Sequence, residues 1–499
     1  MSTQHSILRQ IQATRSRSLA AAALACISMA VASLRAEEPY VLWAKAGPNC
    51  WSVTCTALSP DGHLHAYLGG VNPSGLLRFD SDGRIIATNK LDGILPGGLA
   101  FDPAGNRFMA GSKWADGVFT SAQTNGFIVA KFNERNELLW AHDAGLPDNS
   151  ITSGTALALD SQGNILAAGT IRSSSSYGQY AAGDHDGFFL QKYTPNGQRA
   201  WVRRVEHQNL DMYYDALIQD LAVDPAGNTV IAGYLSAGVT DFGATTLYPP
   251  KGEDGTGRMF VARFTPDGTL QWAQLGYGRS AAVDRSGNIY TIGAAGLVKL
   301  SPNGQVLWTL AVPAWLEWPG GIAVDAQDSP VFTGDFEGTV QFGPFTLRSR
   351  YNPLFLGDFF VAKASPQGQF QWAMAGGGDE YDRGNQVVCD PRGNVYLTGV
   401  FRKSTSYFDG LTITPRGSDL PTLFAAKLSQ APILRIESTA GSPTLRWPAK
   451  ATNYVLEAET SLPAVSWSAV TNKTTVSGRD RRVQLPSTGN AKFFRLRKP

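Results

Sequence analysis

Residues 220–234 read DLAVDPAGNTVIAGY, a segment in which the five residues DPAGN separate two short apolar runs. An Asp accepts hydrogen bonds from backbone amides two residues on, and a Gly adopts positive φ, so the pattern is typical of a hairpin turn. A calcium loop would need further oxygen ligands and a distal Glu, and none follows in the sequence. We therefore interpret DPAGN as the turn between two antiparallel strands.

The same pattern occurs seven times along the chain. Besides the opening segment, the clear copies are GLAFDPAGNRFMAGS (98–112), ALALDSQGNILAAGT (156–170), AAVDRSGNIYTIG (281–293) and QVVCDPRGNVYLTG (386–399). Degenerate copies are TALSPDGHLHAYLGG (56–70) and GIAVDAQDSPVFTG (321–334).

Two further signals follow each copy. The first is an apolar run ending in a basic residue, such as FIVAKF (127–132), MFVARF (259–264) and FFVAKA (359–364). The second is a turn followed four residues later by Trp, as in the step from Gly268 to Trp272. Asn136 replaces Gly before Trp140, and Asn tolerates the left-handed conformation that this turn requires. Only Gly83 leads to Ala87 instead of a Trp.

These signals place four antiparallel strands in each repeat, here called strands a to d in chain order. Seven four-stranded units predict a β-propeller rather than a β-helix or a sandwich. The seventh repeat lacks its own Trp strand, and VLWAKAG (41–47) supplies one from the other end of the repeat region. We expect both ends to meet in one sheet and close the ring, which would leave no edge strand exposed there.

The repeat resembles the SBBP repeat of bacterial secreted seven-bladed propellers. The resemblance is carried by VDPAGNTVIAGY, DFGATTL (241–247), MFVARF and LQWAQLG (270–276), and VQFGPFTL (340–347) and YFDGLTIT (407–414) share the middle element. It covers about residues 40–430 and implies a binding or surface role with no defined catalytic residues.

The composition changes after the last repeat. Residues 433–499 alternate apolar and polar residues in short runs, which predicts a small β-sandwich with Trp447, Tyr454, Trp467 and Phe493 in its core. By pattern it is similar to fibronectin type III or immunoglobulin-like modules. The expected fold is thus all-β: a seven-bladed β-propeller over residues 37–430 with a small C-terminal β-sandwich.

The N-terminus has the pattern of a secretory signal peptide. Three Arg precede the apolar run LAAAALACISMAVASL (19–34), and small residues follow before an acidic start. The run is too short for a membrane span of about 20 residues. We expect residues 1–36 to be removed, the protein to be exported, and no transmembrane segment to remain.

Removal of residues 1–36 takes away four Arg and no acidic residue, which leaves a net charge of about −2. No basic surplus remains to neutralise a phosphate backbone, so we expect no nucleic-acid partner.

Cys50 and Cys55 bracket CWSVTC and are a candidate disulfide in an oxidising compartment. His63 and His65 are two residues apart on one strand face. They could bind a metal ion as a pair, or they could simply be solvated residues at the start of a strand.

The long connections fall on one face of the predicted propeller. Hairpins a–b and c–d are short, whereas the b–c and d–a connections carry the insertions at 171–186, 235–257, 335–357 and 401–421. Function concentrates in such variable loops. We call this side the loop-rich face and the opposite side the turn face.

Aromatic and charged residues gather in the connections of the loop-rich face. Aromatic planes beside carboxylates and Arg suit a sugar or peptide ligand, although the same residues could instead pack beneath the loops. The candidate ligand-binding residues are Trp51, Trp114, Tyr213, Tyr214, Tyr277, Arg279, Trp315, Trp318, Asp379, Tyr381 and Arg383.

Catalytic and metal-binding patterns are weak. The sequence has no nucleophile elbow, zinc-protease motif or phosphate loop, so no catalytic residue, metal ligand or cofactor is predicted. Our first hypothesis is a non-catalytic binding protein for a glycan or a protein. The alternatives are a polysaccharide hydrolase or lyase that uses acids such as Asp379, Glu380 and Asp382, and a structural cell-surface component.

Overall fold

The computed structural model describes most of the chain as β-structure. The described residues are 38–69, 75–91, 94–113, 126–143, 151–172, 185–209, 216–250, 258–293, 295–313, 320–350, 357–402, 405–415, 420–439, 442–460, 466–485 and 493–499. They contain strands and no helix, which confirms the all-β prediction. In this part of the chain no helix is long and apolar enough to cross a membrane. The predicted signal peptide lies outside these residues.

In the described part of the repeat region, seven sheets each have their own core of four antiparallel strands. Sheet 1 contains β2 (Ser52–Leu58), β3 (Leu64–Gly69), β4 (Gly75–Phe79) and β5 (Ile85–Lys90). Sheet 2 contains β6 (Ile94–Phe101), β7 (Arg107–Lys113), β8 (Gly126–Phe132) and β9 (Leu138–Asp143). Sheet 3 contains β10 (Ile151–Leu159), β11 (Ile165–Arg172), β12 (His185–Tyr193) and β13 (Arg199–Asn209). Sheet 4 contains β14 (Leu217–Val223), β15 (Thr229–Leu235), β18 (Arg258–Phe264) and β19 (Leu270–Leu275).

The remaining three sheets follow the same order. Sheet 5 contains β20 (Ser280–Val283), β21 (Ile289–Gly293), β22 (Gly296–Leu300) and β23 (Val306–Leu310). Sheet 6 contains β24 (Ile322–Val324), β25 (Pro330–Phe336), β28 (Asp358–Ala364) and β29 (Phe370–Gly377). Sheet 7 contains β30 (Asp382–Cys389), β31 (Val395–Phe401), β34 (Thr422–Ser429) and β1 (Tyr40–Asn49), so its outer strand comes from the start of the described chain.

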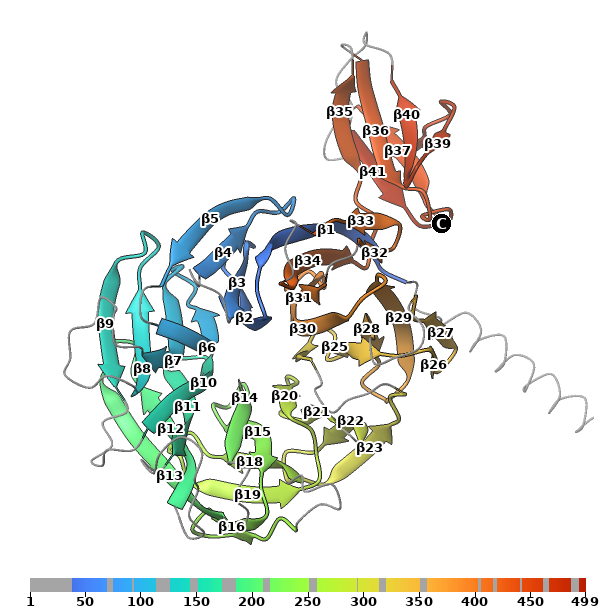
Figure 1. Ribbon diagram of the computed structural model, residues 1–499. Helices are drawn as coiled ribbons and strands as arrows, with labels where there is room; N and C mark the ends of the chain where they lie inside the picture. Colours follow the sequence, from blue (N-terminus) through green and yellow to red (C-terminus); the bar gives the residue numbers. More distant parts are fainter. Residues whose placement is uncertain are drawn as a thin grey trace, which may run out of the picture. The chain divides into compact units, whose positions relative to one another are not determined.

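The first strands of these sheets contact one another in a closed cycle. Strand β2 contacts β6, and the contacts continue through β10, β14, β20, β24 and β30 back to β2. Figure 1 shows first strands such as β2, β14, β20 and β30 toward the centre with the other strands of their sheets further out, and it shows β1 beside β34. The arrangement is of the propeller type. The hydrophobic core is correspondingly divided into clusters, most of which lie between successive sheets.

The DPAGN segment is the predicted hairpin turn. The Asp224 Oδ1 accepts hydrogen bonds from the backbone N–H of Ala226 at 2.9 Å and of Asn228 at 2.8 Å. Gly227 has a φ of 83°. In the c–d turn of sheet 2, Asn136 takes the same left-handed conformation with a φ of 67°. The carboxylate of Asp224 therefore organises a tight turn between β14 and β15.

The three repeated sequence signals meet between neighbouring sheets. Arg263 on β18 forms an ion pair with Asp224 at 2.5 Å and donates to the carbonyl of Pro302 in the c–d turn of sheet 5. The indole of Trp272 donates to the same carbonyl at 2.9 Å. Asp160, Lys192 and Trp201 repeat this contact to Pro266, and Asp284, Lys299 and Trp308 repeat it to Pro366. We call this set of interactions the inter-sheet contact.

The FG-x-x-T-L element forms hairpins that cover other strands. Strands β16 (Gly238–Asp241) and β17 (Thr246–Leu247) extend sheet 3 beyond β13, and β32 (Ser406–Phe408) and β33 (Leu411–Ile413) extend sheet 6 beyond β29. Strands β26 (Thr339–Phe342) and β27 (Phe345–Arg348) pair only with each other. Phe342 and Phe408 are fully buried. Within the described residues, the insertions at 235–257, 335–357 and 401–421 therefore contain packed hairpins, two of which protect sheet edges.

The C-terminal residues form two small sheets that share a core. One sheet contains β35 (Arg435–Thr439), β36 (Ser442–Pro448), β39 (Thr475–Ser477) and β40 (Asp480–Gln484), and the other contains β37 (Val455–Glu459), β38 (Ser468–Ala469) and β41 (Phe493–Arg497). Trp447 is buried in their core and Tyr454 packs against it, as predicted. Phe493 is exposed, because the alternation of β41 turns Phe494 toward the core instead. Trp467 is half-buried with Arg495 over its ring.

Substitution of Asp224 with Ala tests the inter-sheet contact. The change leaves the Arg263 guanidinium buried without its carboxylate, so we expect the free energy of unfolding to fall by about 3–5 kcal/mol in denaturant titrations. Glu337→Ala removes an exposed carboxylate and is the matched control, for which we expect a change within about 0.5 kcal/mol. Equal effects of the two substitutions would show that the buried pair does not hold the sheets together.

Candidate functional site

The structure describes six of the eleven predicted binding residues. Trp114, Tyr213, Tyr214, Trp315 and Trp318 lie outside the described residues. Trp51, Asp379, Tyr381 and Arg383 belong to connections or strand starts around sheets 6, 7 and 1. Tyr277 and Arg279 precede β20 in sheet 5.

Trp51, before sheet 1, lies near three residues of sheet 7 and its connections, namely Tyr381, Arg383 and Arg402. Arg402, just after β31, lies with its guanidinium carbon 5.7 Å from the ring centre of Trp51, whose side chain is 51% exposed. Tyr381 interacts electrostatically with Arg402 and hydrogen-bonds with Arg383. Burial raises the pKa of the Tyr381 phenol, so it is a neutral hydrogen-bonding group at physiological pH. The predicted Trp51, Tyr381 and Arg383 are thus brought into one neighbourhood.

Asp335, near the end of β25, extends this neighbourhood into sheet 6. Its Oδ1 lies 3.9 Å from the Arg383 Nε. Burial raises the pKa of Asp335 to about 6 even though the positive charge of Arg383 lowers it. We call Trp51, Asp335, Tyr381, Arg383 and Arg402 the loop-face cluster.

Two more carboxyl groups are buried next to the loop-face cluster. Asp382 and Asp358 open β30 and β28, and each side chain is 1% exposed. The Asp382 Oδ2 accepts from the backbone N–H of Gly378 at 2.5 Å, and the Asp358 Oδ2 accepts from the N–H of Arg350 at 2.8 Å. Burial, helped by nearby acidic groups that include Asp358, raises the pKa of Asp382 to about 8. Burial likewise raises the pKa of Asp358 to about 6.

Tyr277 and Arg279 belong to a different part of the loop-rich face. Tyr277 packs against the core cluster between sheets 4 and 5. The Arg279 guanidinium lies 5.3 Å from the ring centre of Tyr234, and its backbone N–H donates to the carbonyl of Ile292 at 3.0 Å. These two predicted residues therefore contact the scaffold around them, as the packing alternative describes.

Sequence reasoning missed Asp335, Asp358 and Arg402. Each stands at the loop-rich end of a b or c strand, in the segments TGDF (333–336), GDFF (357–360) and VFRK (400–403). A charged residue inside a run that is otherwise apolar was the available signal. Asp335 and Arg402 lie at the start of the connections 335–357 and 401–421, and Asp358 directly follows the first of these connections.

The predicted disulfide is corrected by the structure. Cys50 and Cys55 are free, buried thiols. Cys50 packs in the cluster between sheets 7 and 1, whereas Cys55 packs in the cluster between sheets 1 and 2. A register irregularity between Val53 and Cys55 contributes to this placement. The two sulfur atoms therefore lie on opposite sides of sheet 1, and burial raises the pKa of each thiol to about 12.

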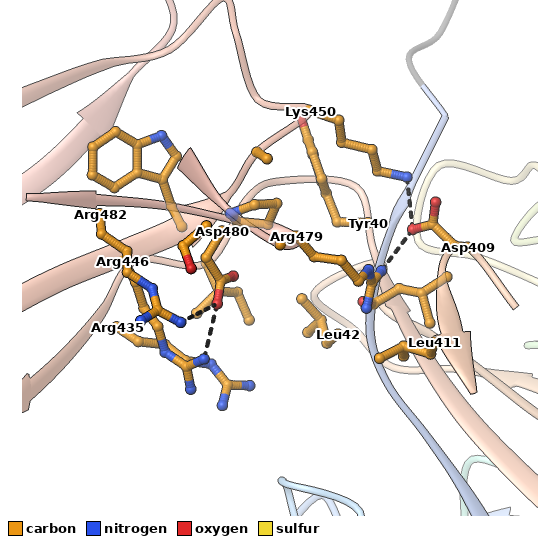
Figure 2. A pocket seen from close by; sticks show the side chains of 17 residues that line it. Tyr40, Leu42, Asp409, Leu411, Arg435, Arg446, Lys450, Arg479, Asp480 and Arg482 are labelled. Atoms are coloured by element: carbon orange, nitrogen blue, oxygen red, sulfur yellow. Dashed lines mark hydrogen bonds and ion pairs between the residues drawn. The ribbon is translucent and has the colours of Figure 1, made fainter. Parts of the chain in front are cut away.

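A separate cleft of about 620 Å³ lies where the C-terminal sheets meet β1 and β33 (Figure 2). Asp409 accepts from Lys450 at 3.0 Å and from Arg479 at 2.9 Å, and Lys450 also donates to the carbonyl of Pro39. Tyr40 of β1 is buried in the core of the C-terminal sheets. The polar groups of this cleft thus attach the C-terminal sheets to the β32–β33 hairpin of sheet 6 through Asp409, and to β1 through the carbonyls of Pro39 and Val41.

Metal ligands and relatives give little further guidance. Within the described ranges, no three His, Cys, Asp or Glu side chains are grouped to hold a metal ion. No family model and no curated protein matches the sequence.

Solved structures do resemble this one. They include the Dos1 propeller, with 9% identity over 76% of this chain and 78% of that chain and a TM-score of 0.40. The WD40 domain of SCAP from fission yeast has 8% identity over 89% and 95% of the two chains and a TM-score of 0.34. Regucalcin, a calcium-binding protein from Agrobacterium tumefaciens, has 12% identity over 68% and 92% and a TM-score of 0.30. These likenesses are remote, and we draw nothing about function from them.

The raised pKa of Asp382 predicts a pH-dependent loss of stability. The folded chain holds this proton up to about pH 8, whereas the unfolded chain releases it near pH 4, so the free energy of unfolding falls between these values. Asp382→Asn removes the effect. As the pH rises from 5 to 8, we expect the free energy of unfolding of the variant to increase by roughly 3 kcal/mol relative to that of the wild type, as measured in denaturant titrations. Glu206→Gln removes an exposed carboxylate that does not contribute to the pKa of Asp382, so its pH dependence should match that of the wild type, and an Asp382→Asn curve that also matches the wild type would contradict the assignment.

Asp409→Ala tests how the C-terminal sheets are attached. The substitution removes the shared partner of Lys450 and Arg479 from a partly exposed site, so we expect a loss of about 1 kcal/mol. Amide hydrogen exchange in Tyr40–Trp43 should accelerate. Glu437→Ala, which breaks the pair with Arg446 inside the C-terminal sheets, is the control and should leave exchange in Tyr40–Trp43 unchanged.

Proposed function

We propose that the chain is an exported, non-catalytic binding protein that recognises a glycan through its loop-rich face. Its scaffold is a seven-bladed β-propeller of SBBP-like repeats followed by a fibronectin-like β-sandwich. Seven four-stranded sheets and the closed cycle of contacts between their first strands support the blade count. The signal-peptide pattern of residues 1–36 supports export.

The loop-face cluster carries the proposal. It combines an exposed indole, a neutral phenol, two guanidinium groups and one carboxyl group within a continuous row from sheet 1 to sheet 6. Aromatic planes stack on the apolar faces of sugar rings, while fixed polar groups take the hydroxyls. Because the residues come from strand ends and their immediate neighbours, the cluster is positioned by the scaffold.

A polysaccharide hydrolase is the second candidate, and the buried acids favour it. A carboxyl group that keeps its proton at neutral pH, as Asp382 does, is suited to general acid catalysis. Asp382 and Asp358 are each only 1% exposed, however, and both accept backbone hydrogen bonds. A general acid has to reach the substrate oxygen, so their burial favours a structural role and the binding proposal over the enzyme.

Glycan-array binding of the full chain tests the proposal. We expect saturable binding to a subset of glycans, with at least a tenfold loss of affinity in the Trp51→Ala/Tyr381→Ala double variant. Phe493→Ala, which removes an exposed aromatic residue from the C-terminal sheets, is the matched control and should bind like the wild type. Absence of glycan binding, or equal binding by the double variant, would overturn the proposal and favour a protein partner or a structural role.

Hydrolysis of the bound glycans by the wild type separates the enzyme from the binding protein. If the wild type releases products, and Asp382→Asn abolishes this release but keeps its glycan affinity, the protein is the hydrolase. Binding without product release would support the non-catalytic binding protein.

A further inference from the structure

A second cleft opens on the turn face where the inter-sheet contact is incomplete. In the outer strands, Trp140, Trp201, Trp272 and Trp308 each pair in register with the basic residue of strand c. In sheet 1 the register pairs Arg78 with Ala87. A cleft of about 550 Å³, within the size range of small-ligand sites, is lined by Ala87 and by turn residues of sheets 1 and 2.

The neighbouring turn departs from the repeat pattern at the same place. A Cβ added to the turn residue Gly268 would lie 3.0 Å from the indole of Trp201. A Trp on strand d therefore leaves no room for a side chain at this position of the turn that it covers. Asn136 occupies the equivalent turn position next to Ala87 and lines the cleft. The small residue at position 87 thus permits a polar side chain at position 136.

Arg107 is a buried cation at the base of this cleft. It is 5% exposed, and the residues equivalent to it in the other repeats are the uncharged Leu64, Ile165, Thr229, Ile289, Pro330 and Val395. Its Nη2 donates to the Asn136 Oδ1, and its guanidinium lies 4.7 Å from the ring centre of Phe132. Its Nε has no partner, and among the described residues no carboxylate pairs with it.

A buried guanidinium without an anion is costly to fold. Burial lowers the pKa of Arg107 to about 10, so the group remains charged at neutral pH. Arg78, which also lines the cleft, differs because it pairs with Asp61 at 2.5 Å. Arg135 also lines the cleft, but its side chain is exposed to solvent. Arg107 is therefore a buried positive charge that no carboxylate of the described residues compensates.

Besides Arg107 and the other charged residues Asp61, Arg78, Glu134 and Arg135, the cleft is lined by neutral polar groups and by the aromatic ring of Phe101. His65 is 6% exposed, burial lowers its pKa to about 3, and its Nδ1 has no hydrogen-bond partner in the described part of the chain. Phe101 packs on the His65 ring with 4.6 Å between the ring centres. Amide groups of Asn89, Asn133 and Asn136 also line the cleft. These groups suit a hydroxylated ring, since amides and a neutral imidazole bond hydroxyls and Phe101 offers an apolar surface.

We propose that this cleft binds the carboxylate of a sugar acid, with Arg107 as the anion-binding residue and the amide side chains contacting the ring hydroxyls. Guanidinium groups bind carboxylates in a bidentate fashion. Asp61 and Glu134 also line the cleft, and their negative charges disfavour a dianion such as phosphate. The site lies on the opposite face from the loop-face cluster and stands independently of it.

Calorimetric titration of the full chain with sodium D-glucuronate tests the site. We expect saturable binding, no binding of D-glucose, and at least tenfold weaker binding of acetate and of inorganic phosphate. Arg107→Thr, which installs the residue found at the equivalent position 229, should lose binding at least tenfold. Arg84→Gln removes the same charge from an exposed position of sheet 1 and should bind normally.

The double variant Ala87→Trp/Asn136→Gly separates loss of the site from loss of the fold. It restores the residues of the other repeats and fills the cleft, so it should abolish glucuronate binding while its melting temperature stays at or above that of the wild type. Glucuronate binding unchanged in both the double variant and Arg107→Thr would overturn the site. Absence of glucuronate binding by the wild type, or equal affinity for phosphate, would overturn the sugar-acid assignment.

Discussion

The structure depends on burying a charged pair between neighbouring sheets. The Asp that organises the a–b turn also neutralises the Lys or Arg of strand c, and that cation in turn donates to a carbonyl in the next sheet, as Asp224, Arg263 and Pro302 show. A buried cation requires both partners, so the turn of the next sheet must lie against it. The Trp of strand d then covers the same turn. The three signals of each repeat are therefore parts of one interaction.

This contact divides the molecule into a constrained side and a variable side. On the turn face, a short c–d turn presents a carbonyl to its neighbour and has a residue in the left-handed conformation, which is Gly except at Asn136 of sheet 2. On the loop-rich face, insertions are tolerated, yet the hairpins around Phe342 and Phe408 are packed and do not form open loops. The polar residues left at the start of sheet 7 are held by strand ends, so their positions follow from the sheet register. The proposed binding surface would therefore need little reordering on contact with a ligand.

Local patterns predicted the local structure well. The strand order, the turn geometry at Asp224 and the left-handed Asn136 follow from residues within about ten positions of each other. The partners of Asp335, Asp358 and Arg402 depend on how distant strands are placed, and a charged residue beside an apolar run does not reveal which distant side chains it will contact. The Cys50–Cys55 prediction was wrong for a related reason, because spacing along the chain does not reveal that the two thiols face different sheets.

The exception in sheet 1 is more than a missing Trp. If Ala87 were only a defective copy, the turn facing it would keep its Gly and the strand beside it would keep an uncharged residue. Instead, Asn136 and Arg107 both differ from the other repeats, and their side chains bond to each other. Each change alone weakens the scaffold, since one removes a conformationally suited Gly and the other buries a charge. The three departures meet in one cleft, and an anion bound by Arg107 there would account for all of them, including the buried charge that the hydrogen bond to Asn136 does not neutralise.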